Sequence, residues 1–190
     1  MLMQPTGVLR ASLPVDIAIT YMAPIIGEFS NRYPGIAFDF DLTPRQVNLA
    51  TEPFDVAIRI GTPDDSQLIA RHLADLPGHL YASPGYLARA GEPVAPADLQ
   101  AHQCLHMRSN GTWTLADGNA IVQVAVASRF TVNSAGFLKR LALLDQGIVM
   151  MPEAIEVLRA DDAQSIELNI RKDSHADIEL LADFNGHVCS

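Results

Sequence analysis

The sequence has little of what secreted and membrane proteins need. It contains only two cysteines, Cys104 and Cys189, so a disulfide framework is not expected. Its longest apolar runs, such as Ile121–Ala127, are far shorter than the roughly 18 residues of a membrane-spanning helix. The first residues lack the basic start, the long apolar stretch and the small-residue cleavage site of a secretory signal. These absences predict a cytoplasmic protein that crosses no membrane.

Positive charge is also scarce. The chain has 13 Lys and Arg residues against 22 Asp and Glu residues, which gives a formal net charge of −9. Because DNA binding depends mainly on Lys and Arg neutralising phosphates, this chain by itself is not expected to bind DNA. The remaining composition, 48% apolar and 18% charged over 190 residues, is typical of one large or two small globular domains and not of a disordered chain.

The common catalytic and cofactor motifs are missing. The sequence has no G-x-S-x-G elbow, Walker loop, G-x-G-x-x-G or H-E-x-x-H, so the usual nucleophile, phosphate and zinc sites are not indicated. The stretch "HQCLH" could place His102, Cys104 and His106 on one face of a strand, and both residue types bind zinc. A further ligand is not apparent, and a buried Cys usually packs as a small apolar residue. We therefore expect no metal and no cofactor.

The first part of the chain reads as strands separated by helices. "GVLRASLP" and "IAFDFDL" read as strands, and "FDVAIRIG" reads as a buried strand that nevertheless contains Arg59. Between the first two we expect a helix from Thr20 or Tyr21 to about Arg32, because Pro24 is tolerated only in the first turn of a helix. Residues Pro14–Ile19 would then form a loop.

A second, shorter helix is expected after "IAFDFDL". "TPRQ" has Thr43 in the N-cap position, Pro44 in the first helical position and Gln46 where a capping box requires it. This pattern predicts a helix that runs to about Glu52. The resulting order of strand, helix, strand, helix and strand predicts a parallel sheet with right-handed crossovers.

The pattern changes in the second part of the chain. "HLYASPGYLARAG" predicts a strand and then a short helix, with Ser83 as its cap and Pro84 in its first position. "APADLQAHQCLHM" repeats helix and strand, and "TWTL", "IVQVAVAS" and "RFTVNS" are rich in strand-forming residues. "SAGFLKRLALLDQG" predicts an amphipathic helix between Ser134 and Gly147. "IVMMPEAIEVL" adds a buried strand and a helix that opens on Pro152. A second lobe is therefore expected.

Three stretches carry a family resemblance. They begin "GVLRASLPVDIAITYMAPIIGEFSNRYPG", "FDVAIRIGTPDDSQLIARHLADLPGHLYASPGYLARAG" and "FTVNSAGFLKRLALLDQGIVMMPEAI". In this order and spacing they resemble the effector-binding domain of LysR-type transcriptional regulators, from about Gly7 to Leu158. The resemblance implies an α/β, two-lobed fold like that of type 2 periplasmic binding proteins, each lobe a mixed sheet flanked by helices. Residues 7–80 would form the first lobe, with 159–190 returning to it, and residues 81–158 the second.

The resemblance also implies a function. A small-molecule effector held between the lobes would shift an equilibrium between open and closed forms. We expect a homodimer whose interface buries apolar positions on the helix that contains Ile25 and Phe29. Contacts across this interface would relay the change to a DNA-binding domain. The winged helix-turn-helix of the family is missing from this chain, and the tail after Leu158 departs from the family's usual final strand and helix. The chain is not expected to be an enzyme.

The expected effector site follows from the strand order. Ligands of open α/β sheets lie beyond the carboxyl ends of the strands, where helix N-termini offer free N–H groups. Such strand ends should meet in the first lobe, and the resemblance adds a helix start from the second. The expected contacts are Pro14, Val15, Asp16, Thr43, Arg59, Ile60, Gly61, Asn133 and Ser134.

Several of these residues have alternative roles. Arg59 could bind a carboxylate effector, or it could pair with an acidic neighbour at a sheet edge. Asp16 could repel simple anions and favour an amine, a polyol or a neutral hydrogen-bond donor. Alternatively, it could cap the loop or the helix start, or face solvent. Thr43 and Ser134 are helix caps on either reading. Asp55, before the buried strand, is expected in a turn or a cap.

Two other functional classes share the expected architecture. A solute-binding protein of a transporter would need export, and the secretory signal it would require is absent. An enzyme would need convergent titratable groups, whereas the sequence offers only Asp16 and Arg59 near the expected cleft.

Overall fold

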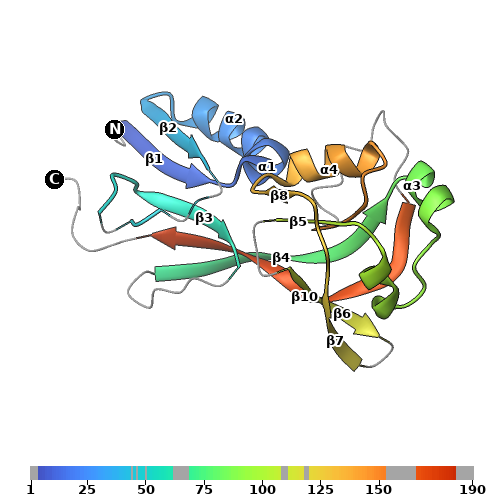
Figure 1. The fold of residues 1–190 in the computed structure, drawn as a ribbon. Coiled ribbons are helices and arrows are strands. Elements are labelled where there is room, and N and C mark those ends of the chain that lie inside the picture. The colour runs from blue at the N-terminus through green and yellow to red at the C-terminus, as the bar shows by residue number, and fades with distance from the viewer. Residues whose placement is uncertain are drawn as a thin grey trace. The chain divides into compact units, whose positions relative to one another are not determined.

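The computed structural model describes residues 4–43, 45, 47–49, 51–61, 69–107, 111–117, 120–152 and 166–182. The elements, shown in Figure 1, divide into two compact units, Met1–Asp75 with Asp177–Ser190 and Leu76–Ala176. The chain passes between the units within β4 (Ile69–Ala82) and again within β10 (Ile166–Ala182). Each unit combines strands with helices, so the predicted α/β class is confirmed.

The sheet of the first unit contains the three predicted parallel strands. They are β1 (Gly7–Leu13), β2 (Ile36–Leu42) and β3 (Val56–Ile60), in the order β2-β1-β3, and β10 lies antiparallel to β3. Burial along β1 increases toward its end, where the last three residues are all buried. The most buried part of β1 is therefore its carboxyl end.

Asp55 joins the start of β3 to the middle of β1. Its backbone N–H donates to the carbonyl oxygen of Arg10 at 2.9 Å, and its Oδ2 accepts the Arg10 backbone N–H at 2.8 Å. The side chain thus supplies a bond that the strand ladder would otherwise provide. This contact is structural, as the sequence indicated, but it crosses between strands instead of capping a local turn.

The first helix begins earlier than predicted. It runs without interruption through α1 (Val15–Ile17), the π-helical segment η1 (Ala18–Met22) and α2 (Ala23–Arg32). The expected loop over Pro14–Ile19 is therefore wrong, since only Pro14 precedes the helix. A proline inside an α-helix clashes with the carbonyl four residues before it, and a π-helical turn displaces that carbonyl. The η1 segment directly before Pro24 thus allows the helix to continue.

The helix predicted from "TPRQ" is also wrong for the residues that the structure describes. Between Thr43 and Glu52 these residues form turns and bends, and Pro44 and Gln46 lie outside the described residues. The Thr43 hydroxyl accepts the backbone N–H of Arg45 at 3.3 Å, which closes a local turn. Arg45 also pairs with Glu52 through its side chain. Side-chain bonds therefore order this segment in place of a helical ladder.

In the described residues of the second unit, a sheet is combined with a hairpin and three helices. Its strands follow the order β4-β9-β5-β8, with β4 antiparallel to β9, β5 parallel to both β9 and β8, and β6 paired with β7 in the hairpin. The elements are α3 (Pro84–Ala90), the 3₁₀ helix η2 (Pro96–Ala101), β5 (Cys104–Met107), β6 (Thr112–Asp117), β7 (Ala120–Ala125), β8 (Thr131–Val132), α4 (Ala135–Leu143) and β9 (Ile148–Pro152). The helix predicted after Pro152 lies outside the described residues.

The predicted helix caps of the second unit are confirmed. The hydroxyls of Ser83 and Ser134 each accept a backbone N–H from three residues later at 3.3 Å. Gly147, beyond the end of α4, has a φ of 152°. A Cβ at this position would collide with the backbone carbonyl oxygen of Gln103, so glycine is required here.

The sheet of the second unit is buried on both faces. In β5, Cys104 and Leu105 enter different apolar clusters, and Ile148 and Val149 of β9 do the same. All four are at most 1% exposed, which explains why these strands read as nearly continuous apolar runs. Within the described ranges, no helix combines the length and the hydropathy required to span a bilayer.

Candidate functional site

The first unit brings three strand ends to one edge of its sheet. Pro14, Thr43 and Gly61 directly follow β1, β2 and β3, which are parallel neighbours. The register pairs Leu13 with Leu42, so the ends of β1 and β2 are level. This is the edge at which open α/β sheets bind ligands.

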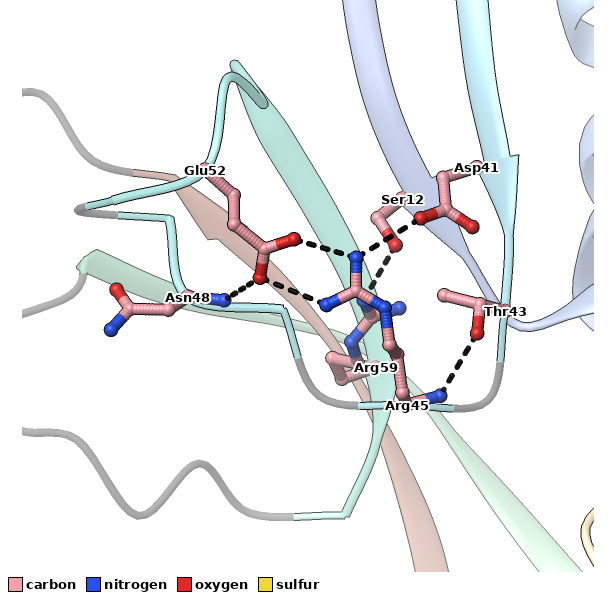
Figure 2. A network of polar contacts seen from close by, with 7 residues as sticks. All are labelled: Ser12, Asp41, Thr43, Arg45, Asn48, Glu52 and Arg59. Atoms are coloured by element: carbon pink, nitrogen blue, oxygen red, sulfur yellow. Dashed lines mark hydrogen bonds and ion pairs between the residues drawn. The ribbon is translucent and has the colours of Figure 1, made fainter.

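Arg59 lies at this edge, near the end of β3. Its Nη2 donates to the Ser12 hydroxyl at 2.6 Å (Figure 2). Its Nη1 donates to the Ile58 carbonyl oxygen at 2.8 Å. Ser12 is fully buried and Arg59 is half-buried. Among the described residues no carboxylate forms a salt bridge with Arg59, so the acidic partner that we considered is not found there.

Burial is the main influence on the Arg59 guanidinium. It lowers the pKa of this group from its ordinary value, because removal from water disfavours the charged form. The negative charges of Asp41 and Glu52 act in the opposite direction, and the positive charge of Arg45 acts in the same direction as burial. Arg59 is therefore a partly desolvated cation with a second cation nearby.

Arg45 pairs with carboxylates, whereas no carboxylate in the described part of the chain pairs with Arg59. Its Nη1 and Nη2 donate to Oε1 and Oε2 of Glu52 at 2.9 and 2.6 Å, and its Nη2 lies 3.4 Å from Oδ2 of Asp41 (Figure 2). Glu52 also accepts the backbone N–H of Asn48 at 2.9 Å. The bonds from Arg45 and then from Asn48 lower the pKa of Glu52 to about 2, and the pairing raises the pKa of Arg45.

The remaining predicted contacts of the first unit belong to the start of α1 and to the end of β3. Val15 and Asp16 form the first turn of α1, whose N-cap residue, Pro14, makes no side-chain capping bond. A carboxylate in the first turn of a helix interacts favourably with the helix dipole, which is the structural alternative for Asp16. Ile60 is 42% exposed, and Gly61 has a φ of 97°, a conformation that favours glycine.

Asn133 and Ser134 belong to the second unit. Asn133 is exposed directly before α4, and Ser134 caps this helix through the Phe137 backbone N–H. A small hollow of about 20 Å³ also lies in this unit, which is room for about one water molecule. Its walls are Tyr81, Ser83, Lys139, Ala142, Leu143, Val149 and Met151. None of the predicted contacts lines it.

The "HQCLH" residues have structural partners. Nδ1 of His102 lies 3.1 Å from the Tyr86 hydroxyl, the Cys104 thiol contacts the Leu99 carbonyl oxygen at 3.7 Å, and Nδ1 of His106 lies 2.8 Å from the Met107 carbonyl oxygen. Burial raises the pKa of Cys104 to about 12. No metal-binding group of His, Cys, Asp or Glu occurs within the described part of the chain.

Sequence reasoning missed Ser12, Arg45 and Glu52. Ser12 had a usable signal, because a hydroxyl placed just before the end of a buried strand needs a polar partner. Arg45 and Glu52 had none, because in the helix predicted here residues seven positions apart are separated by two turns, about 10 Å along the axis, which is too far for a direct pair. Their pairing depends on the turn at Thr43 that replaces the predicted helix.

Comparisons with known proteins agree with the fold. The model of the LysR substrate binding domain family matches residues 3–179. An HTH-type transcriptional regulator of Xanthomonas campestris pv. campestris (strain 8004) is 35% identical over 153 residues, which are 77% of this chain and 44% of that protein. The HTH-type transcriptional regulator CrgA of Neisseria meningitidis serogroup C (strain 8013) is 35% identical over 154 residues, 78% of this chain and 50% of that protein.

A solved structure shows the same architecture. The regulatory domain of CrgA, a LysR-type transcriptional regulator from Neisseria meningitidis, has a TM-score of 0.82 and 30% identity, covering 95% of this chain and 91% of that one. This likeness confirms the predicted fold of the LysR effector-binding domain. The chain spans about half the length of the curated relatives it matches. With the family model covering most of its length, the chain belongs to the LysR substrate binding domain family, the effector-binding domain of LysR-type transcriptional regulators.

Proposed function

We propose that this domain senses a small-molecule effector at the strand-end edge of the first unit. The observation that carries this proposal is Arg59, a half-buried cation whose bonds run to a hydroxyl and a carbonyl oxygen. A charge held in this way costs stability unless something completes its hydrogen bonds, and such groups are common at binding sites. The proposed contacts are those expected from the sequence: Pro14, Val15, Asp16, Thr43, Arg59, Ile60, Gly61, Asn133 and Ser134.

The effector would act by joining two lobes. We place the first lobe at residues 7–80 with 159–190 and the second at residues 81–158, and the start of α4 would supply Asn133 and Ser134 as the opposite wall. A ligand that contacts both lobes favours the form in which they are close, by as much as its affinities for the two forms differ. The domain would then act as a switch without any catalysis.

In the whole regulator this switch would act on DNA through another domain. A chain with a net charge of −9 supplies little attraction for phosphates, so DNA binding would rest on a winged helix-turn-helix joined to it. We propose that the domain pairs as a homodimer through α2, which has no buried residue and exposes 58% of Ile25 and 37% of Phe29. Such a regulator would work in the cytoplasm.

A thermal-shift screen of small metabolites tests the site. A ligand at 100 times its dissociation constant adds about 2.7 kcal/mol of stability, which is visible as a raised melting temperature. The shift should shrink in Arg59→Gln and in Asn133→Ala, one variant for each unit. Arg10→Gln is the matched control, because Arg10 lies on the same sheet and pairs with Asp39 at the surface. Equal shifts in all these proteins, or no stabilising metabolite at all, would contradict the proposal.

A further inference from the structure

The two arginines near the strand-end edge, Arg45 and Arg59, differ in their partners. Arg45 binds the carboxylate of Glu52, whereas Arg59 binds a hydroxyl and a carbonyl oxygen. This difference bears on the chemistry of the effector. We infer that the effector presents one carboxylate to Arg59, and that the Arg45–Glu52 pair restricts the site to a single negative charge. This inference rests on the proposed function, because it concerns the ligand of the same site. It assigns a role to Arg45 and Glu52 that neither the fold nor the sequence pattern assigns.

Arg59 is prepared to receive a planar anion. Two of its N–H donors are fixed, one by the fully buried Ser12 hydroxyl and one by the Ile58 carbonyl oxygen. These bonds hold the plane of the guanidinium, and its other N–H donors have no acceptor among the described residues. A carboxylate matches a guanidinium with two parallel hydrogen bonds, which an amide or an amine cannot do. Ser12 is therefore a positioning residue and Arg59 the binding residue.

Arg45 is occupied by a carboxylate of the protein itself. The Glu52 carboxylate accepts hydrogen bonds from both Nη atoms of Arg45, and the Asn48 backbone N–H donates a further bond that holds Glu52 in this position (Figure 2). Asp41 adds a second negative charge at 3.4 Å from Arg45. An effector could bind Arg45 only by displacing Glu52 from this bidentate ion pair. A second negative charge on the effector would also be repelled by Glu52 and Asp41.

The balance of charges gives the same result. Arg45 and Arg59 repel one another, and Glu52 and Asp41 offset this repulsion. With both acids ionised, the four side chains carry no net charge, while Arg59 still has unsatisfied donors. A single carboxylate of the effector satisfies those donors. The second carboxylate of a dianion would instead lie beside the negative charges of Glu52 and Asp41. Glu52 is thus the residue that selects a monoanion over a dianion.

The inference predicts that selectivity changes when Glu52 is neutralised. Glu52→Gln would release Arg45 and place a second guanidinium beside Arg59, so that a dicarboxylate gains a partner. Glu28→Gln is the matched control, because it removes the same charge from an exposed position of α2. Both variants are compared with the wild type after their amide NMR spectra show that they are folded.

The experiment titrates benzoate, benzamide and isophthalate while following the side-chain Nε–Hε resonance of Arg59. Benzoate should move this resonance and its neutral isostere benzamide should not, and Arg59→Lys should weaken benzoate binding by about tenfold or more. Ser12→Ala should weaken it less and leave the preference for benzoate over benzamide in place. Glu52→Gln should raise the affinity ratio of isophthalate to benzoate by about tenfold, and Glu28→Gln should not change it.

Several results would overturn the inference. Benzamide and benzoate could bind equally, or benzoate binding could be unchanged in Arg59→Lys. The Arg59 resonance could stay in place with every carboxylate up to roughly 50 mM. Finally, the affinity ratio of isophthalate to benzoate could be the same in Glu52→Gln and Glu28→Gln. A neutral or cationic metabolite could stabilise the wild type, with a thermal shift that is lost in Asn133→Ala but unchanged in Arg59→Gln. This result would refute the inference but leave the proposed sensing function intact. Failure of every metabolite to bind would refute the proposed function itself.

Discussion

The Arg45 guanidinium holds both carboxylate oxygens of Glu52, at 2.9 and 2.6 Å, although the two residues are seven positions apart in an irregular segment. The backbone N–H of Asn48 adds a further bond to the same carboxylate. All of these bonds favour the ionised acid, and they lower the pKa of Glu52 from 4.5 to about 2. The ordering of the segment between β2 and β3 is therefore coupled to proton binding.

This coupling predicts a pH dependence of stability. A carboxylate whose pKa is depressed by folding stabilises the folded state above its unfolded pKa, and that stability is lost as the pH falls toward the folded pKa. For Glu52 this window lies between about 4.5 and 2. The wild type should therefore exceed Glu52→Gln in the free energy of unfolding near neutral pH, and the gap should narrow within this window. Urea unfolding of both proteins across the window measures it, and a gap independent of pH would contradict the prediction.

Asp16→Ser should increase the affinity of simple carboxylates. If Asp16 faces the bound effector, its charge repels an anion at close range, and serine removes this repulsion while keeping a polar side chain. Thermal shifts with benzoate, compared between wild type and Asp16→Ser, provide the measurement. Should benzoate stabilise both proteins equally, Asp16 acts only in the first turn of α1 and not on the ligand.

Ile25→Glu should convert a homodimer to a monomer. Ile25 is 58% exposed on α2, and burying a glutamate in an apolar interface is unfavourable. Ile25 is a better test than Phe29, because Phe29 already contacts the ring of Tyr33, with centroids 4.7 Å apart. Ile121→Glu on β7 is the control, since Ile121 is 65% exposed in the other unit. Light scattering at tens of micromolar distinguishes the states, and a monomeric wild type would count against pairing through α2.

Two glycine substitutions should shift the melting temperature in opposite directions. At Gly147 the φ of 152° and the nearby Gln103 carbonyl leave no room for a Cβ, so Gly147→Ala should cost about 1–3 kcal/mol. At Gly27, within α2, a Cβ would meet nothing within 4 Å. Gly27→Ala should therefore stabilise the domain by about 0.4–1 kcal/mol by restricting the unfolded chain. Calorimetry of the two variants checks both signs.

Cys104 should be unreactive in the folded domain. Its side chain is 0% exposed and burial raises its pKa to about 12, so the nucleophilic thiolate is scarce at mildly alkaline pH. Maleimide labelling of a Cys189→Ser variant, followed by mass spectrometry, isolates this thiol. We expect labelling only after unfolding in guanidinium chloride. Rapid labelling of the native protein would show that the cluster around Cys104 opens readily.

The strands and caps could be predicted because their signals are local. Each of β1, β2 and β3 appears as a short apolar stretch bounded by turn residues, and Ser83 and Ser134 each bond to an N–H three residues along the chain. The position of Arg59 was also predictable, as the one cation in a buried strand. Ser12 could be expected to need a polar partner, but its pairing with Arg59 was not predictable, because the two residues are 47 positions apart and the strand order brings them together.

The two wrong helix predictions have different physical causes. At Pro24 the rule against internal prolines was sound for an α-helix, but the chain avoids the clash through the π-helical segment η1. At Thr43 the capping pattern was present, yet the Arg45–Glu52 pair and the Thr43 turn stabilise an irregular path instead. Neither competing structure leaves a periodic pattern in the sequence.

The η1 segment also sets the rotation of one half of the helix relative to the other. A π-helical turn is equivalent to one additional residue in an α-helix, which displaces everything after it by about 100° around the axis. Ile17 and Ala18 can therefore remain buried while Ile25 is exposed in the same continuous helix. Deletion of a single codon between Ala18 and Met22 would restore regular winding and turn Ile25 to a different side. In this helix the surface offered to a partner is determined by residue count as well as by residue type.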